Sequence, residues 1–156
     1  MTNPAHKRVY VDSNVLIYAV EGVATTANPA KELIKFLRAH RGLMFTSEIM
    51  LAEVLAPSRG QRAWPLPAKR RVYLDLLLFS GVVNLVPVTR AILIRTADLR
   101  KIAPLKLPDA IHLESAIHTE SGFLVTGDTN FKKLPANLRK VTSNEQGIRD
   151  LLQALA

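Results

Sequence analysis

Four acidic residues in this sequence have surroundings that suit chemistry, and they are spread over most of the chain: Asp12, Glu53, Asp109 and Asp128. Asp12 and Asp128 each follow a short apolar run that is typical of a buried strand. Asp109 follows Pro108 at the start of a predicted helix, and Glu53 lies among apolar residues within another. Carboxylates brought close together repel each other, and either protonation or a bound cation relieves that repulsion.

A cluster made only of carboxylates suits hard cations with oxygen ligands, Mg²⁺ and also Mn²⁺. Such an ion can orient a water, lower its pKa and stabilise charge on a phosphodiester. Each acid taken alone also has a structural explanation. Asp12 could cap a helix, Asp109 could complement a helix dipole, Asp128 could shape a turn, and Glu53 could pair with an arginine. The four residues taken together favour a metal site.

The elements that must position these acids alternate between short apolar runs and longer runs of helical periodicity. Strands are predicted at 9–11, 43–45, 83–86, 123–125 and, more weakly, 141–142. Helices are predicted after Asp12, from Asn28-Pro29 to Gly42, over 47–56, 68–81, 89–102 and 108–122, and in the tail after Ser143 or Asn144. The Pro-rich segment 57–67 predicts a loop.

Strands that alternate with helices predict an α/β fold with a central parallel sheet and helices on both faces. In open parallel sheets, ligands gather beyond the C-terminal ends of the strands, near a switch point in strand order. Asp12 and Asp128 are therefore expected to face one cleft. Helices that start near that edge are expected to supply Glu53 and Asp109.

Length and composition indicate one domain over residues 1–156, with 48% hydrophobic residues and no Cys. The absence of Cys and of an apolar N-terminal run favours a cytoplasmic protein. The most apolar stretch, 76–88, is interrupted by polar residues, Gly and Pro, so no membrane span is expected. The net charge of +8 favours an anionic partner such as nucleic acid.

Four motifs in this order resemble the PIN domain family, and most closely its VapC-type ribonuclease toxins: DSNVLIY at 12–18, SEIMLAEVL at 47–55, LKLPDAIHLESA at 105–116 and LVTGDTNFKKLP at 124–135. The resemblance implies a PIN-like fold with the sheet order 3-2-1-4-5. It matches Asp12, Glu53, Asp109 and Asp128 to the family's metal-binding and catalytic acids. Asn14 and Thr126 match polar residues of the first and last motifs. Asn130 stands where many relatives carry a further acid, which leaves open whether one or two ions bind.

The same resemblance implies an Mg²⁺- or Mn²⁺-dependent endoribonuclease that cleaves RNA phosphodiesters and leaves a 5′-phosphate and a 3′-hydroxyl. It also implies a cognate VapB-type antitoxin that inserts a basic residue into the acidic pocket. A homodimer is expected as well, and the apolar stretch VYLDLLLF at 72–79 could contribute to its interface.

The sequence also allows two alternative functions. One is a catalytically weak or inactive PIN-fold module that binds RNA without cutting it, which the missing acid at Asn130 allows. The other is a phosphotransfer enzyme with an aspartyl nucleophile. Such sites generally need a second Asp two residues after the first, and Asn14 occupies that position.

Basic residues near aromatic ones form a second candidate feature, composed of Arg59, Arg62, Lys69, Arg70 and Arg71 with Trp64 and Tyr73. Such a mixture can hold single-stranded RNA through phosphate contacts and base stacking. The competing interpretation is a solvated loop and helix start with Trp64 folded into the core. Lys132 and Lys133, after Asp128, are candidate phosphate contacts. His112 lies three residues after Asp109 and could approach the acids, although a histidine at such a position is more often a helix-face side chain.

Overall fold

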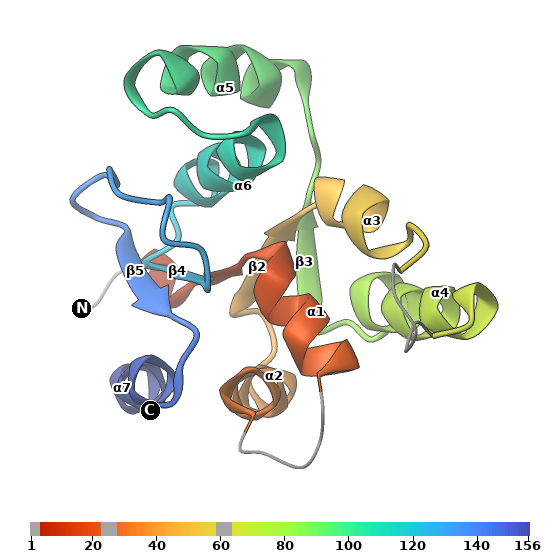
Figure 1. The fold of residues 1–156 in the computed structure, drawn as a ribbon. Coiled ribbons are helices and arrows are strands. Elements are labelled where there is room, and N and C mark those ends of the chain that lie inside the picture. Colours follow the sequence, from red (N-terminus) through yellow and green to blue (C-terminus); the bar gives the residue numbers. More distant parts are fainter. Residues whose placement is uncertain (1–3, 23–27, 59–63) are drawn as a thin grey trace.

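The computed structural model describes residues 4–22, 28–58 and 64–156. Its centre is a parallel sheet of five strands in the order β3-β2-β1-β4-β5 (Figure 1). The strands are β1 (Val9–Val11), β2 (Met44–Ser47), β3 (Val83–Val86), β4 (Phe123–Thr126) and β5 (Arg139–Thr142). The fold class and the strand order expected from the sequence and its resemblance are therefore confirmed.

Helices cover both faces of the sheet (Figure 1). In chain order they are η1 (Pro4–Lys7), α1 (Ser13–Glu21), α2 (Pro29–Ala39), α3 (Ile49–Val54), α4 (Leu66–Leu74), the π-helix η2 (Asp75–Phe79), α5 (Arg90–Ile102), α6 (Leu107–His118) and α7 (Glu145–Leu155). Side chains of a strand alternate between faces. Val9 and Val11 accordingly pack with residues of α1, α2 and α7, whereas Tyr10 packs with residues of α6 on the opposite face.

The predicted helix starts are confirmed at their capping residues. Asn28, Thr89 and Asn144 each accept a hydrogen bond from a backbone N–H of the first turn that follows. Pro29 begins α2, where the missing N–H of proline costs no helical hydrogen bond. Asp12 caps α1 by accepting from the Ser13 amide. The structural explanation offered for Asp12 is thus correct, and it leaves a further role open.

Several predicted boundaries differ from the structure. The helix predicted over 47–56 is shorter because β2 continues to Ser47, and the helix predicted over 68–81 starts at Leu66 and changes into η2. The helix expected to run to Gly42 ends at Ala39, before a turn in which Gly42 has a φ of 88°. The loop predicted at 57–67 lies partly outside the described residues, as do Arg59 and Arg62.

Candidate functional site

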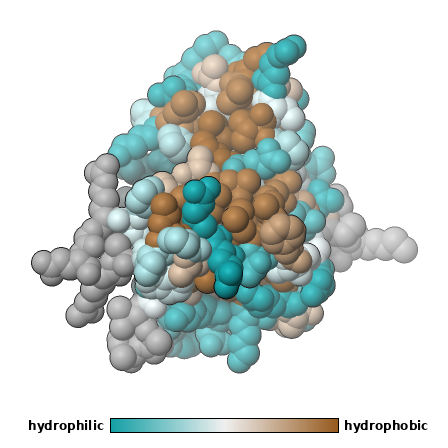
Figure 2. All heavy atoms as spheres, turned by 90° about the vertical axis from the view of Figure 1, so that its right-hand side faces the viewer, coloured by the Kyte–Doolittle hydropathy of each residue, from teal (hydrophilic) through white to brown (hydrophobic). Residues whose placement is uncertain are grey.

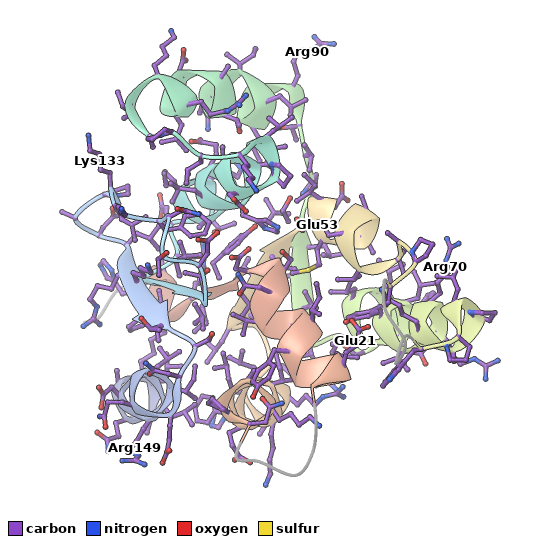
Figure 3. The ribbon with its side chains drawn as sticks, in the orientation of Figure 1. Glu21, Glu53, Arg70, Arg90, Lys133 and Arg149 are labelled. Carbon is purple, nitrogen blue, oxygen red and sulfur yellow. The ribbon has the colours of Figure 1, made fainter. Side chains whose placement is uncertain are left out.

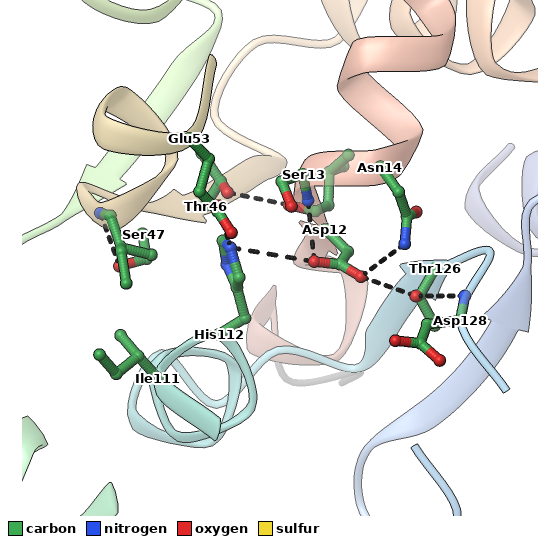
Figure 4. A network of polar contacts seen from close by, with 12 residues as sticks. Asp12, Ser13, Asn14, Thr46, Ser47, Glu53, Ile111, His112, Thr126 and Asp128 are labelled. Atoms are coloured by element: carbon green, nitrogen blue, oxygen red, sulfur yellow. Dashed lines mark hydrogen bonds and ion pairs between the residues drawn. The ribbon is translucent and has the colours of Figure 1, made fainter. Parts of the chain in front are cut away.

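The C-terminal edge of the two central strands holds the first pair of acids. β1 and β4 are neighbours in register, with Val11 opposite Val125. Asp12 directly follows β1, and Asp128 lies two residues beyond Thr126 at the end of β4. The Thr126 hydroxyl donates to Asp12 Oδ2 at 2.7 Å and accepts from the Asp128 amide at 2.9 Å (Figure 4). One threonine therefore links the two acidic segments that the sequence predicted to meet.

Asp12 is almost completely buried, with 1% of its surface exposed. Its Oδ1 accepts from the Ser13 amide at 2.8 Å, and Asn14 Nδ2 donates to Oδ2 at 3.1 Å. Within the part of the chain that the structure describes, no Lys or Arg forms an ion pair with Asp12, Glu53, Asp109 or Asp128. Burial of a carboxylate without a cationic partner is unfavourable, so this arrangement needs an explanation other than stability.

Asp109 is half-buried in the first turn of α6. Burial raises the pKa of the Asp109 carboxyl above its ordinary value, and the nearby charges of Asp12 and Asp128 raise it further. Glu53 acts in the same direction, whereas His112 lowers that pKa. The fold therefore brings the four acids, from four separate elements, within electrostatic reach of one another.

Glu53 lies on α3, at the centre of the molecule as viewed in Figure 3, and its side chain is 24% exposed. Its Oε2 is 2.8 Å from Nε2 of His112, which is completely buried. The same nitrogen is 3.9 Å from Asp12 Oδ1, so His112 lies between the two carboxylates (Figure 4). On its other side, His112 Nδ1 is 2.8 Å from the Tyr10 hydroxyl.

His112 was only a minor candidate in the sequence, and Tyr10 was not a candidate. The signal for His112 is its spacing of three residues from Asp109, which places both on neighbouring positions of one helix face. The signal for Tyr10 is the alternation of side-chain direction along β1. Tyr10 therefore faces α6, whereas Val9 and Val11 face α1.

The donor set fits a hard cation, because its oxygens come from carboxylates, the ligands that Mg²⁺ and Mn²⁺ prefer. In residues 4–22, 28–58 and 64–156, no group of three or more His, Asp or Glu side chains has an arrangement that could already hold an ion. Glu53 instead contacts His112. The four acids nevertheless converge on one region of the fold.

Comparison with known families gives a match over residues 9–137 to the model described as PIN domain. The chain belongs to the PIN domain family. Two solved structures share its fold. One is a toxin-antitoxin complex from Klebsiella pneumoniae, with 24% identity, a TM-score of 0.59 and coverage of 84% of this chain and 95% of that chain. The other is VapBC2 from Rickettsia felis bound to a DNA fragment from its promoter, with 17% identity, a TM-score of 0.62 and coverage of 87% and 98%. A search of curated proteins found no match.

In this PIN domain, Asn14 and Thr126 both contact the acid Asp12. Asn14 also accepts from the Gly127 amide at 3.1 Å through Oδ1, so it joins the start of α1 to the end of β4. The side chain of Asn130 is exposed, and its backbone amide donates to Asp128 Oδ1 at 2.8 Å. Asp128 thus stabilises a turn, as its structural explanation predicts. It also lies close enough to Asp109 to raise the pKa of that residue.

The basic cluster of the PIN domain divides into buried and exposed residues. Lys69 is buried: its Nζ donates to the Ala56 carbonyl at 2.8 Å and to Ser58 Oγ at 2.7 Å. Lys69 therefore fits neither interpretation of the basic cluster, because its ammonium is occupied inside the fold. Arg70 and Arg71 are exposed, and Trp64 is 38% exposed rather than folded into the core. Figure 3 shows Arg70 and Lys133 pointing outward on opposite sides of Glu53.

The PIN domain also has an apolar surface on the side formed by α3 and α4 (Figure 2). Val72, Leu78 and Phe79 of α4 and η2 are exposed, and Phe79 reaches 76%. A groove of about 670 Å³ between α1, α2 and α4 is lined by apolar side chains, with Lys31, Lys35 and Arg38 among its other residues. No helix among the described residues has the length and apolar character needed to cross a membrane.

Proposed function

We propose that this PIN domain is a divalent-metal-dependent endoribonuclease in which Asp12, Glu53, Asp109 and Asp128 hold Mg²⁺ or Mn²⁺. The observation that carries the proposal is the convergence of four carboxylates without any Lys or Arg ion pair among the described residues. Mutual repulsion of this kind is costly unless a cation enters. Nuclease activity that uses divalent metals is general for the PIN family, which supports the same conclusion.

The residues of this chain would each have a defined task. Thr126, Asn14 and the Ser13 amide orient the buried Asp12 carboxylate. Burial and the charges of the other three acids raise the pKa of Asp109, and a bound cation would offset their repulsion. When bound, a divalent cation supplies a Lewis acid that activates water and offsets the charge developing on a phosphodiester. Cleavage would leave a 5′-phosphate and a 3′-hydroxyl.

The positive net charge of the chain supports a polyanionic substrate such as RNA. The acidic site lies in a protein with a net charge of +8, and exposed Arg70, Arg71, Lys132 and Lys133 would contact phosphates outside the acidic centre. Phosphate contacts of this kind supply affinity without sequence information. A chain without Cys suits the reducing cytoplasm, where RNA is present.

We also propose a protein partner of the VapB antitoxin type, in keeping with the complexes in which the two similar folds were solved. The groove between α1, α2 and α4 has apolar side chains beside three basic ones, Lys31, Lys35 and Arg38. This combination suits an amphipathic segment with acidic residues. A basic residue of the partner could then neutralise the acidic site. The exposed apolar side chains of η2, Leu78 and Phe79, support a homodimer interface.

A second candidate function is an RNA-binding PIN module that does not cleave. The contact between Glu53 and His112 favours it, because that contact occupies one oxygen of a proposed ligand. The two functions differ in their dependence on metal. A module that only binds would retain RNA in the presence of a chelator and would leave it intact in Mg²⁺.

The deciding experiment incubates total cellular RNA with the protein in Mg²⁺, Mn²⁺ or EDTA. Wild-type protein is expected to cleave in either metal and not in EDTA. Asp12→Asn is expected to lose more than about 1,000-fold in rate, as when one member of a unit that acts together is removed. Asp98→Asn is the matched control, since Asp98 is an exposed carboxylate that pairs with Lys101. Equal cleavage by wild type and Asp12→Asn would refute the proposal.

A further inference from the structure

A path of hydrogen bonds crosses the fold from the end of β2 to the proposed metal ligand Glu53. The Ser47 amide donates to the Tyr10 hydroxyl at 2.9 Å, and that hydroxyl is 2.8 Å from His112 Nδ1. His112 Nε2 is in turn 2.8 Å from Glu53 Oε2. The path joins β2, β1, α6 and α3, and its members Tyr10 and His112 are completely buried.

The directions of the two contacts made by His112 depend on its tautomer, and the Ser47 amide favours one of them. A backbone N–H can only donate, so the Tyr10 oxygen accepts from Ser47 and keeps its own proton free to donate. Burial raises the pKa of the Tyr10 hydroxyl, which therefore stays protonated. When Tyr10 donates to His112 Nδ1, that nitrogen is an acceptor and the ring proton is on Nε2. That proton points at Glu53 Oε2.

Glu53 has such a partner in His112, whose Nε2 is 2.8 Å from Oε2. Glu53 lies on a helix of only six residues, and its side chain is partly exposed. The charge of Asp12 nearby would drive an unattached Glu53 carboxylate outward towards solvent. A donor on Nε2 would hold Oε2 within the site, beside the other acids. Hydrogen-bond partners of metal-binding carboxylates commonly have this orienting role.

We infer that His112 and Tyr10 are positioning residues that hold the Glu53 carboxylate ready for the cation, an inference that rests on the proposed function. His112 is not assigned a catalytic role, because it is 0% exposed and cannot reach a substrate. The Tyr10 hydroxyl acts one step further away, by fixing the orientation of the imidazole ring. Truncation at His112 should therefore have a larger effect than loss of the Tyr10 hydroxyl.

The first test needs neither RNA nor metal. Long-range ¹H–¹⁵N spectra of the apo protein report which ring nitrogens of His112 are protonated. A proton on Nε2 is the expected result. An Nε2 without a proton would overturn the inference, because this nitrogen and the Glu53 carboxylate would both be acceptors and could form no hydrogen bond.

The second test measures Mn²⁺ affinity by calorimetry in His112→Leu, His112→Gln and Tyr10→Phe, with circular dichroism as a check of folding. His112→Leu is expected to bind Mn²⁺ about 10- to 100-fold more weakly. Gln keeps an N–H near the position of Nε2, so His112→Gln should recover much of the affinity, and Tyr10→Phe should lose less than His112→Leu. The controls are His118→Gln on the exposed end of α6 and Tyr18→Phe on the exposed side of α1.

The outcomes separate this inference from the proposed function. Mn²⁺ affinity that is unchanged in a folded His112→Leu, with normal binding by wild type, would overturn the positioning role and leave the proposed function intact. A wild-type protein that binds no Mn²⁺ and cleaves no RNA would overturn both. If His112→Leu does not fold, His112→Gln and Tyr10→Phe provide the test. Mn²⁺ affinities of these two variants equal to those of the controls would then overturn the inference.

Discussion

The two ends of α1 present two different ways of keeping a carboxylate inside a protein. At the C-terminal end, Glu21 accepts from the Tyr73 hydroxyl at 2.5 Å and from Ser58 Oγ at 3.1 Å, and the Lys69 ammonium is 3.9 Å away. At the N-terminal end, Asp12 accepts from the Ser13 amide, the Asn14 side chain and the Thr126 hydroxyl, and three further acids lie nearby. The first carboxylate has a lysine partner, whereas among the described residues no Lys or Arg pairs with the second.

The difference distinguishes a structural acid, Glu21, from Asp12, which we propose to bind a cation. A carboxylate at a helix C-terminus faces the negative end of the dipole, and Lys69 offsets that cost for Glu21. Burial and the Glu21 charge raise the pKa of Tyr73, so its hydroxyl remains a donor. The acids around Asp12 keep acceptor capacity that the described residues do not fill. Unpaired buried charge of this kind points to a ligand rather than to stability.

The largest expected effect outside the acidic site comes from removing the cation at Glu21. Lys69→Met should destabilise the fold by about 3 kcal/mol, because it leaves a mostly buried carboxylate without its partner. The double variant with Glu21→Gln should recover part of that loss, and chemical denaturation of both variants measures it. Cleavage per folded molecule should be unchanged. A loss in Lys69→Met that Glu21→Gln does not reduce would contradict the pairing.

A smaller effect of opposite sign is expected at Asp109. Its pKa is raised in the folded state, so the folded protein holds this proton more tightly than the unfolded chain does. The stability it contributes is present below the ordinary pKa of Asp and is lost as pH rises through the raised value. At neutral pH without metal, Asp109→Asn should therefore melt at a slightly higher temperature than wild type.

Thermal melts in EDTA over a pH series measure this difference. The advantage of Asp109→Asn should vanish at acid pH, where the wild-type carboxyl is protonated. Addition of Mg²⁺ should stabilise the wild type more than the variant. A variant that melts below wild type at neutral pH without metal would show that Asp109 is a structural acid like Glu21.

The smallest effect is expected from exposed cations. Arg70→Ala combined with Arg71→Ala should weaken RNA binding several-fold in EDTA, and the slope of log affinity against log salt should fall by about 0.7 for every phosphate that the variant no longer neutralises. Arg149→Ala on α7 is the control, since its guanidinium pairs with Glu145. Identical salt slopes for all three proteins would remove Arg70 and Arg71 from the RNA-binding surface.

Much of the site could be predicted from the sequence because its acids mark the ends of strands and the starts of helices. Asp12 and Asp128 follow apolar runs, and parallel strands bring such positions to one edge. The strand order came from the resemblance, since the pattern of runs does not fix it. The buried partners could not be predicted, because they depend on distant packing. Tyr10 meets His112 across 102 positions of sequence.

The burial of Lys69 could not be predicted from the sequence either. In the sequence it is one of several basic residues after a Pro-rich segment, and nothing local separates it from Arg70. Only the packing of α4 against α1 and α3 turns Lys69 inward, to Glu21 and the Ala56 carbonyl, while Arg70 stays outside. The position of a charge on a short helix is thus set by its neighbours in space.

The hydrogen bond from the Ser13 amide to Asp12 makes that amide a reporter of the site. Its proton lies against the carboxylate oxygen, so its chemical shift should respond when the charge on Asp12 is neutralised. A single backbone resonance would then follow arrival of a cation or of an antitoxin side chain in real time. No labelled RNA and no engineered probe would be required.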